Sequence, residues 1–149
     1  MFWLQEGSAS VLIPKARPRT TLSPTIALDR AGRIIAIGSR GSDYQDQWVL
    51  QAFLRHVGYD FDLQSAVDAP MFQCDHWPRS DYPRDATPKK VSMDDRFATE
   101  VLNEMRERGH DVRIPQDRRW GRVCAARKNG QLLAAAASST PSHFLALGR

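Results

Sequence analysis

Residues 25–37, TIALDRAGRIIAI, decide the fold because two short apolar runs flank a turn. The runs are Thr25–Leu28 and Ile34–Ile37, and the Asp29–Arg33 segment between them contains Gly32. Short apolar runs bounded by turn residues are typical of two strands joined as a hairpin. Because both runs show little alternation of polar and apolar residues, we expect the hairpin to be covered on both faces.

The segment after the hairpin has the periodicity of an amphipathic helix. Between residues 45 and 57, apolar side chains recur every three or four positions. Leu50 and Leu54 widen this apolar surface, so we expect the helix to be buried on much of its circumference. Gly58 is suited to end the helix, because glycine adopts the left-handed conformation common after a helix.

Two further helices are predicted downstream. A short one is expected over residues 63–68, before a proline. A longer one is expected to begin with Asp94 or Asp95 as its N-terminal cap and to end near Arg108. Gly109 follows and provides the stop.

The remaining elements are extended. Asn129-Gly130 lies between the last two extended runs and is a strong signal for a hairpin. This order of elements predicts an α+β layered domain with a largely antiparallel sheet. Residues 1–22 are expected to be an irregular lead-in to a single domain over 1–149. The runs predicted as strands are 71–74, 91–93, 111–114, 122–127 and 131–136.

Charge and composition exclude several classes of protein. The 21 Lys and Arg residues exceed the 17 Asp and Glu residues by four, but they are scattered. Nucleic-acid binding usually requires a coherent basic stripe on a recognised module, so we expect no nucleic-acid partner. No apolar run approaches the ~18 residues of a membrane-spanning helix, so we expect no membrane partner. The first residues lack a signal-peptide pattern, which leaves the cytoplasm as the default expectation for an otherwise undetermined compartment.

Cysteine and histidine spacing offers no site for a metal or a cofactor, and we predict neither. Two cysteines, Cys74 and Cys124, are too few for a disulfide framework. The four histidines form neither HxxxH nor HExxH. Cys74 and His76 lie two positions apart, but a structural thiol beside a loop histidine explains them better than a catalytic pair.

Two segments could bind an anion, although ordinary turns are the better explanation of both from the residues alone. Residues 38–43, GSRGSD, form a glycine-containing loop before a helix, where backbone N–H groups can face an anion or an oxyanion. Residues 20–25 hold four hydroxyl groups, which suit either turn chemistry or a carboxylate ligand. From the residues alone no activity can be assigned.

Several motifs, in one order, carry a resemblance to a known family. Residues 17–25, RPRTTLSPT, match Arg-Pro-x-(Ser/Thr)-(Ser/Thr)-x-Ser-Pro-Thr, and residues 38–43 fall where a Gly-(Ser/Thr)-Pro-Gly-Gly loop is expected. In this the chain resembles the C-terminal part of the small subunit of γ-glutamyltransferases, also called γ-glutamyl transpeptidases. The resemblance covers nearly the whole chain and continues at residues 68–70, 108–112, 121–125 and 146–149.

The resemblance implies a fold and a reaction. The fold is that of N-terminal-nucleophile hydrolases, an αββα sandwich of two mostly antiparallel sheets between helical layers. A precursor cleaves itself into a large and a small subunit, and the new terminal threonine of the small subunit is the nucleophile. Glutathione or another γ-glutamyl small molecule gives a γ-glutamyl-enzyme, and water or an amino acid then takes the acyl group.

Site residues follow from the resemblance, position by position. Thr20 and Thr21 match the hydroxyl pair that binds the α-carboxylate of the γ-glutamyl group. Gly41 and Ser42 match the pair whose backbone N–H groups form the oxyanion hole. Short hydroxyl groups donate to carboxylates, and a backbone N–H survives a change from glycine to serine, so the residue types suit both roles.

The chain also departs from the family pattern. Arg40 replaces the loop proline, and Ser42 replaces the second glycine, which would strain the loop if that position has a positive φ. Residues 138–141 stand where the family has Asp-Pro-Arg. The nucleophilic threonine and the large subunit are expected outside this chain, so no catalytic residue is assigned. The chain alone is then expected to be inactive, and the missing large-subunit or upstream segment is its expected partner.

A different class of function stays open. The chain could be a non-catalytic, degenerate relative that acts as an oligomeric binding module, with Trp48 and Phe53 packed against another copy. In either case we expect open sheet edges and an exposed apolar face, and therefore association through them. A basic anion-binding or nucleic-acid-binding protein is the least supported hypothesis.

Overall fold

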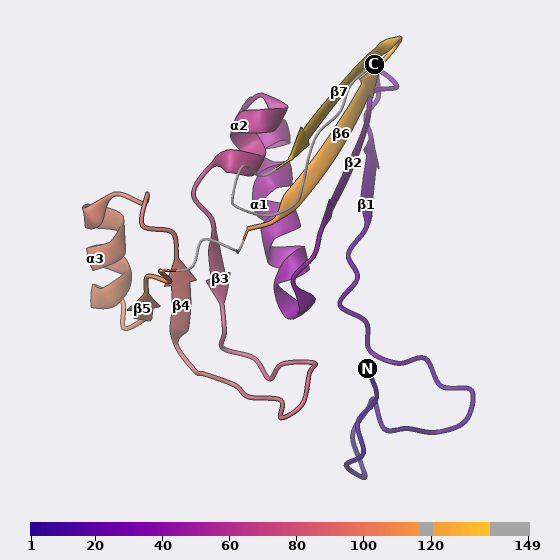
Figure 1. The fold of residues 1–149 in the computed structure, drawn as a ribbon, viewed down its shortest axis with the longest axis vertical. Coiled ribbons are helices and arrows are strands. Elements are labelled where there is room, and N and C mark those ends of the chain that lie inside the picture. Colours follow the sequence, from indigo (N-terminus) through magenta and orange to yellow (C-terminus); the bar gives the residue numbers. More distant parts are fainter. Residues whose placement is uncertain (117–120, 138–149) are drawn as a thin grey trace.

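The computed structural model describes residues 1–116 and 121–137. Its strands and helices follow the order that the sequence predicts (Figure 1). They are β1 (Thr25–Leu28), β2 (Ile34–Ser39), the 3-10 turn η1 (Ser42–Tyr44), α1 (Gln45–Gly58), α2 (Leu63–Asp68), β3 (Phe72–Cys74), β4 (Lys90–Met93), α3 (Thr99–Glu107), β5 (Asp111–Arg113), β6 (Val123–Asn129) and β7 (Leu132–Ala137).

The larger sheet has four antiparallel strands in the order β1-β2-β6-β7. The predicted hairpin of β1 and β2 is confirmed, with Leu28 opposite Ile34. Asp29 closes its turn, because one carboxylate oxygen accepts hydrogen bonds from the backbone N–H groups of Ala31 and Arg33, both at 2.9 Å. Gly32, with φ of 77°, supplies the left-handed residue of that turn.

The second hairpin joins β6 and β7 and is shifted by one residue from the sequence prediction. Asn129 pairs with Leu132, so the two loop residues are Gly130 and Gln131 rather than Asn129 and Gly130. Gly130 has φ of 59° at the first loop position. Glycine adopts this positive φ without steric cost, so it fits the first position of a two-residue hairpin loop.

The smaller sheet has three strands in the order β3-β4-β5. β3 and β4 are antiparallel, and β4 and β5 are parallel because α3 connects them as a crossover. Figure 1 shows α1 and α2 between this sheet and the larger one. The predicted α+β class with mostly antiparallel pairing is therefore confirmed.

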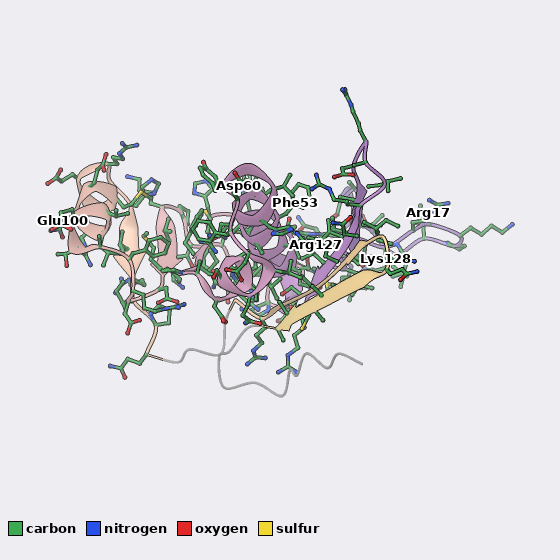
Figure 2. All side chains as sticks on the ribbon, turned by 90° about the horizontal axis from the view of Figure 1, so that it is seen from above. Arg17, Phe53, Asp60, Glu100, Arg127 and Lys128 are labelled. Carbon is green, nitrogen blue, oxygen red and sulfur yellow. The ribbon has the colours of Figure 1, made fainter. Side chains whose placement is uncertain are left out.

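The core lies between α1, α2 and one face of the larger sheet. Ile35, Ile37 and Val123 point from that face and are buried, together with Trp48 and Ala52 of α1. Trp48 therefore packs within its own chain, and the idea that it packs on another copy is wrong. Phe53 is half-buried and packs against the same core. In Figure 2, Phe53 lies next to the strands, on the side of Arg127, with which it lines one cavity.

The opposite face of the larger sheet is exposed in the described part of the chain. Ile26 is 76% exposed and Leu28 69% exposed, and Ile34 shares their face through the pairing of β1 with β2. The prediction that the hairpin is covered on both faces is thus wrong within the described residues. The expected exposed apolar face is present.

Helix α1 is less buried than its sequence suggests. Its buried residues are Gln45, Trp48, Val49 and Ala52, which lie on one face, whereas Leu50 and Leu54 are exposed. The prediction that much of its circumference is buried is wrong, because the sheet covers only one side. Gly58 belongs to the helix, and the left-handed residue that follows is Asp60, with φ of 56°.

Helix α3 begins later than predicted. Its N-terminal cap is Ala98, and neither Asp94 nor Asp95 caps it. Asp94 instead accepts hydrogen bonds from the backbone N–H of Arg96 at 3.0 Å and from its guanidinium at 2.7 Å. This local turn competes with helix formation, as aspartate side chains commonly do. Gly109, with φ of 90°, ends the helix as predicted.

Two negative findings apply to residues 1–116 and 121–137. No helix there is long and apolar enough to cross a bilayer. No group of three or more His, Cys, Asp or Glu side chains there is arranged to hold a metal ion. Cys74 and Cys124 are both free thiols.

Candidate substrate-binding site

The loop between β2 and α1 is built on two consecutive residues with positive φ. Gly41 has φ of 146°, and a Cβ atom there would lie 2.4 Å from Cζ3 of Trp48, so only glycine fits. Ser42 has φ of 52°, a left-handed conformation that is unusual for serine. Its hydroxyl group donates a hydrogen bond of 2.6 Å to the Asp81 carboxylate, which offsets part of the strain.

The backbone of this loop presents two N–H groups. Neither Gly41 N–H nor Ser42 N–H donates a hydrogen bond to another described residue. The Tyr44 N–H donates to the Gly41 carbonyl at 3.1 Å and closes the turn, so the two amides are held at the start of the helical segment. N–H groups at such a start favour negative charge.

The segment with the two threonines lies beside this loop. Gln45, only 6% exposed, donates hydrogen bonds from its side-chain amide to Thr21 Oγ1 at 3.5 Å and to the Ser42 carbonyl at 3.2 Å. Thr20 is exposed, and its hydroxyl accepts a hydrogen bond from the Leu22 N–H at 3.2 Å. The structure therefore brings Thr21 and Ser42 together, with Thr20 adjacent, while their roles toward a substrate stay predictions.

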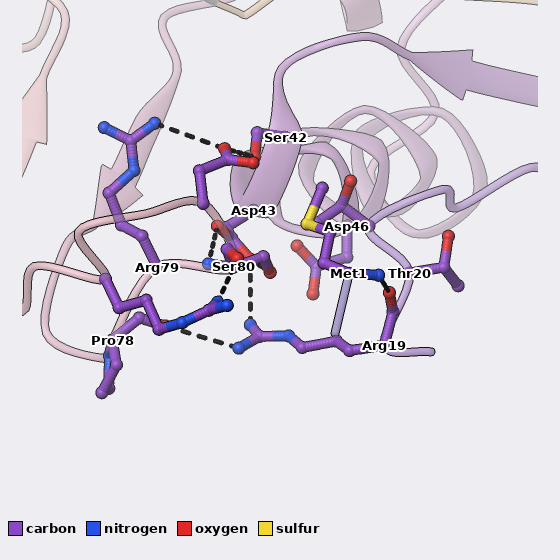
Figure 3. Close-up of polar contacts among 12 residues, drawn as sticks. Met1, Arg19, Thr20, Ser42, Asp43, Asp46, Pro78, Arg79 and Ser80 are labelled. Carbon is purple, nitrogen blue, oxygen red and sulfur yellow. Dashed lines mark hydrogen bonds and ion pairs between the residues drawn. The ribbon is translucent and has the colours of Figure 1, made fainter. Parts of the chain in front are cut away.

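Asp43 ties three segments together (Figure 3). Its carboxylate pairs with the Arg19 guanidinium at 2.9 Å and accepts from the Ser80 backbone N–H at 2.7 Å and from the Ser80 hydroxyl. Ser80 is 1% exposed, although it belongs to the long connection between β3 and β4. The sequence analysis did not select Asp43, Ser80 or Gln45 as site residues. The one available signal was Asp43, because an acidic residue in the first turn of a helix is favourable there.

Tyr44 connects the loop to the smaller sheet. Its hydroxyl donates to Asp75 Oδ1 at 2.6 Å, and Asp75 also pairs with Lys90 Nζ at 3.2 Å. Burial, together with the hydrogen bond to Asp75, raises the pKa of Tyr44 to about 12. The phenol is therefore protonated at neutral pH, and its hydrogen bond to Asp75 joins the start of α1 to the segment after β3.

Two glutamines of α1 complete the attachment of the smaller sheet. The side-chain amide of Gln47 accepts from the Cys74 N–H at 2.7 Å and donates to the Cys74 carbonyl at 3.2 Å. Gln51 repeats the pattern with the Phe72 N–H at 3.1 Å and its carbonyl at 2.8 Å. Because they are one helical turn apart, the two amides pair with alternate residues of β3, as a neighbouring strand would.

The family model described as gamma-glutamyltranspeptidase matches residues 1–144. The chain belongs to the gamma-glutamyltranspeptidase family. The resemblance that the sequence motifs indicated is thereby confirmed, although residues 138–141 and 146–149, which bear on it, lie outside the described residues.

Curated relatives in this family are much longer than the chain. An oxamate amidohydrolase proenzyme of Klebsiella pneumoniae is 30% identical over 117 residues, which are 78% of this chain and 21% of that protein. A glutathione hydrolase proenzyme of a Pseudomonas species is 32% identical over 80 residues, 54% of this chain and 14% of that protein. The chain therefore spans about one fifth or less of these gamma-glutamyltranspeptidase-family proenzymes.

Solved structures of the family share the fold. LmbA2991T421A is 39% identical, with a TM-score of 0.92, covering 100% of this chain and 27% of that one. The gamma-glutamyltranspeptidase of Pseudomonas nitroreducens complexed with L-DON is 18% identical, with a TM-score of 0.73, covering 96% of this chain and 70% of that one. These neighbours confirm the predicted N-terminal-nucleophile hydrolase fold.

Proposed function

We propose that this chain supplies the carboxylate-binding and oxyanion-binding part of a γ-glutamyl hydrolase or transferase. Thr20 and Thr21 bind the α-carboxylate of the donor, and the N–H groups of Gly41 and Ser42 stabilise the oxyanion. The nucleophilic threonine is supplied from outside these 149 residues by the upstream small-subunit segment of the family precursor, and the large subunit is the further partner. The chain alone then binds but does not turn over.

One observation carries this proposal, namely the hydrogen bonds from Gln45 to Thr21 and Ser42. They hold the two segments, which lie 21 positions apart in sequence, on a single buried amide. The ion pair between Arg19, two residues before Thr21, and Asp43, one residue after Ser42, supports the same arrangement. A carboxylate on the threonines and an oxyanion at the loop could thus belong to one small molecule.

The chemistry of amide hydrolysis or transfer suits this arrangement. Attack on a γ-glutamyl carbonyl places negative charge on its oxygen, and preorganised N–H groups lower the energy of that state. Hydroxyl groups hold the α-carboxylate and so fix the distance from the recognised end to the reacting carbon. The relatives are named as hydrolases of glutathione and of oxamate, so we propose the γ-glutamyl class and use oxamate as the alternative donor.

The test co-expresses the chain with a family segment that carries the terminal threonine and measures release of p-nitroaniline from γ-glutamyl-p-nitroanilide. Thr21→Ala is expected to raise KM about tenfold, the effect of a lost hydrogen bond to a charged group. The effect should vanish with 4-aminobutyryl-p-nitroanilide, which lacks the α-carboxylate. Thr99→Ala, on α3, is the matched control and should leave KM unchanged for both anilides.

Three results would contradict the proposal. The first is turnover by the chain alone, which would place the nucleophile within it. The second is an equal effect of Thr21→Ala on both anilides, because this would separate Thr21 from carboxylate recognition. The third is hydrolysis of oxamate without hydrolysis of the γ-glutamyl anilide, which would change the donor class.

A second candidate is a non-catalytic oligomeric module, and the exposed apolar face around Ile26 and Leu28 favours it. Apolar patches of this kind mark surfaces that a partner covers. Sedimentation velocity separates the two: the module is expected to self-associate whether or not the co-expressed segment is present. Association that is replaced by a one-to-one complex with that segment favours the catalytic proposal.

A further inference from the structure

A cavity of about 740 Å³ lies at the C-terminal end of α1, the end opposite to Gln45. Its apolar lining includes Ile35, Phe53, Val57 and Leu63, and Arg127 is among its polar lining residues. The volume is in the range of small-molecule sites, which are mostly apolar with a few placed polar groups. We propose that this cavity binds a small monocarboxylate with an apolar body, and that Arg127 binds the carboxylate.

Arg127 is unusual for its position in the sheet. It pairs with Ile35 on one side and Ala134 on the other, so it occupies the face of β6 that also carries the buried Ala125. Its neighbours across the sheet, Ala27, Ile35 and Ala134, are all apolar, and Arg127 is half-buried beside them. Its neighbour Lys128 points to the opposite, exposed face of the sheet.

The guanidinium has a neighbour that orients it but does not neutralise it. Nη1 of Arg127 lies 3.4 Å from Nε2 of His56, whose Nδ1 lies 2.7 Å from the Phe61 carbonyl. A carbonyl only accepts, so Nδ1 of His56 carries the proton, and Nε2 presents a lone pair to a guanidinium that only donates. Among the described residues no carboxylate forms an ion pair with Arg127.

The carboxylates that do line the cavity restrict the class of ligand. Asp29 is held by Arg33, and Asp62 by the hydroxyl and N–H of Ser65. Asp60, exposed on the loop after α1, also lines it (Figure 2). Arg33, which also lines the cavity, offsets the charge of Asp29. Asp60 and Asp62 form no ion pair among the described residues and would repel a second anionic group, so a monocarboxylate fits better than a dicarboxylate.

A ligand carboxylate would supply the counter-ion that Arg127 lacks among the described residues. A partly desolvated cation without a counter-ion is unfavourable, and a bidentate carboxylate supplies two charge-assisted hydrogen bonds in the geometry of the guanidinium fork. The phenyl ring of Phe53 and the branched side chains beside it cover the apolar body. Recognition therefore combines one charge with apolar burial.

The test measures binding of phenylacetate, phenylacetamide and phenylmalonate to the 149-residue chain by isothermal titration calorimetry. Phenylacetate is expected to bind at least about tenfold more tightly than the neutral amide, the effect of a hydrogen-bonded charge pair. Phenylmalonate, with a second carboxylate, is expected to bind more weakly than phenylacetate. Equal binding of phenylacetate and phenylacetamide, or no binding of either, overturns the proposal.

Variants assign the effect to Arg127. Arg127→Gln is expected to weaken phenylacetate binding about tenfold and to leave phenylacetamide unchanged. Lys128→Gln is the matched control, because it removes the same charge on the other face of the same strand and should leave both affinities unchanged. If Arg127→Gln does not fold, Arg127→Lys serves instead, since it keeps the charge and loses the bidentate geometry. Unaltered phenylacetate binding in a folded Arg127 variant also overturns the proposal.

Discussion

Gly41 and Trp48 are in such close contact that the indole ring occupies the space of a side chain at position 41. A Cβ atom there would lie 2.4 Å from Cζ3 and 2.9 Å from Cη2 of Trp48. Because Trp48 is 3% exposed and packed in the core, the ring cannot move aside without cost. The loop that carries the predicted oxyanion hole is therefore fixed by the core itself.

Gly41→Ala is expected to lower the free energy of unfolding by about 3 kcal/mol, from overpacking and from backbone strain at positive φ. The free energy of unfolding is measured by urea denaturation, with tryptophan fluorescence as the signal. Gly38→Ala is the control, since a Cβ at Gly38 meets nothing within 4 Å and its φ is not in the left-handed region. Equal effects of the two substitutions would contradict the steric account.

Substitutions at Ser42 should separate strain from hydrogen bonding. Ser42→Ala keeps the strain and loses the 2.6 Å hydrogen bond to Asp81, so a loss of about 1–2 kcal/mol in unfolding free energy is expected. Ser42→Gly loses the same bond but relieves about 1 kcal/mol of left-handed strain, so it should be clearly less destabilising. A double-mutant cycle with Asp81→Ala measures the coupling, which should be near zero if the contact contributes nothing.

Tyr44 predicts a pH dependence at the alkaline end. Its pKa in the folded chain, about 12, is above the ordinary value of 10.0. Below about pH 10 the phenol is protonated in both states, so its contribution to stability is fully present. Between about pH 10 and pH 12 the unfolded chain loses this proton first, so stability should fall as the pH rises.

The measurement compares the urea midpoints of the unaltered chain and of Tyr44→Phe from about pH 9 to about pH 11.5. The difference between them should shrink as the pH rises through this window. The assignment of this pKa to Tyr44 is checked by a titration of tyrosinate absorbance. The titration curve of Tyr44→Phe is subtracted from that of the unaltered chain. A constant difference in midpoint would show that Tyr44 ionises equally in both states.

The glutamine pair of α1 predicts a local effect on β3. Gln47→Ala with Gln51→Ala should remove hydrogen-exchange protection from the N–H groups of Phe72 and Cys74, and should cost about 2 kcal/mol in total. Gln116→Ala is the control, since Gln116 is exposed. Protection that persists in the double variant would show that β3 is held by β4 alone.

Elements with strong local signals were predictable from the sequence. The β1–β2 hairpin, α2 and the end of α3 at Gly109 match the expectation, because apolar periodicity and glycine act over a few residues. Boundaries failed where side chains compete for backbone groups. Asp94 bonds to Arg96 rather than capping α3, and the second hairpin forms one residue later than its Asn-Gly pair suggests.

The candidate site was predictable only through the family resemblance. Motif order pointed to Thr20, Thr21, Gly41 and Ser42, but nothing in local sequence shows which side chains hold them together. The contacts of Gln45 with Thr21 and of Asp43 with Ser80 join residues 24 and 37 positions apart. Such contacts depend on tertiary packing, which a pattern of neighbouring residues does not encode.

The paired amides on α1 have a consequence for how the protein can assemble. A bare outer strand invites β-augmentation by a foreign peptide, and proteins usually guard against it with charge, proline or a bulge. Here a helix blocks the outer side of β3 with hydrogen-bonding groups of its own. Within residues 1–116 and 121–137, β5 is thus the free edge at which a strand from another molecule could extend the smaller sheet, and loss of the two amides would expose β3 as a second such edge.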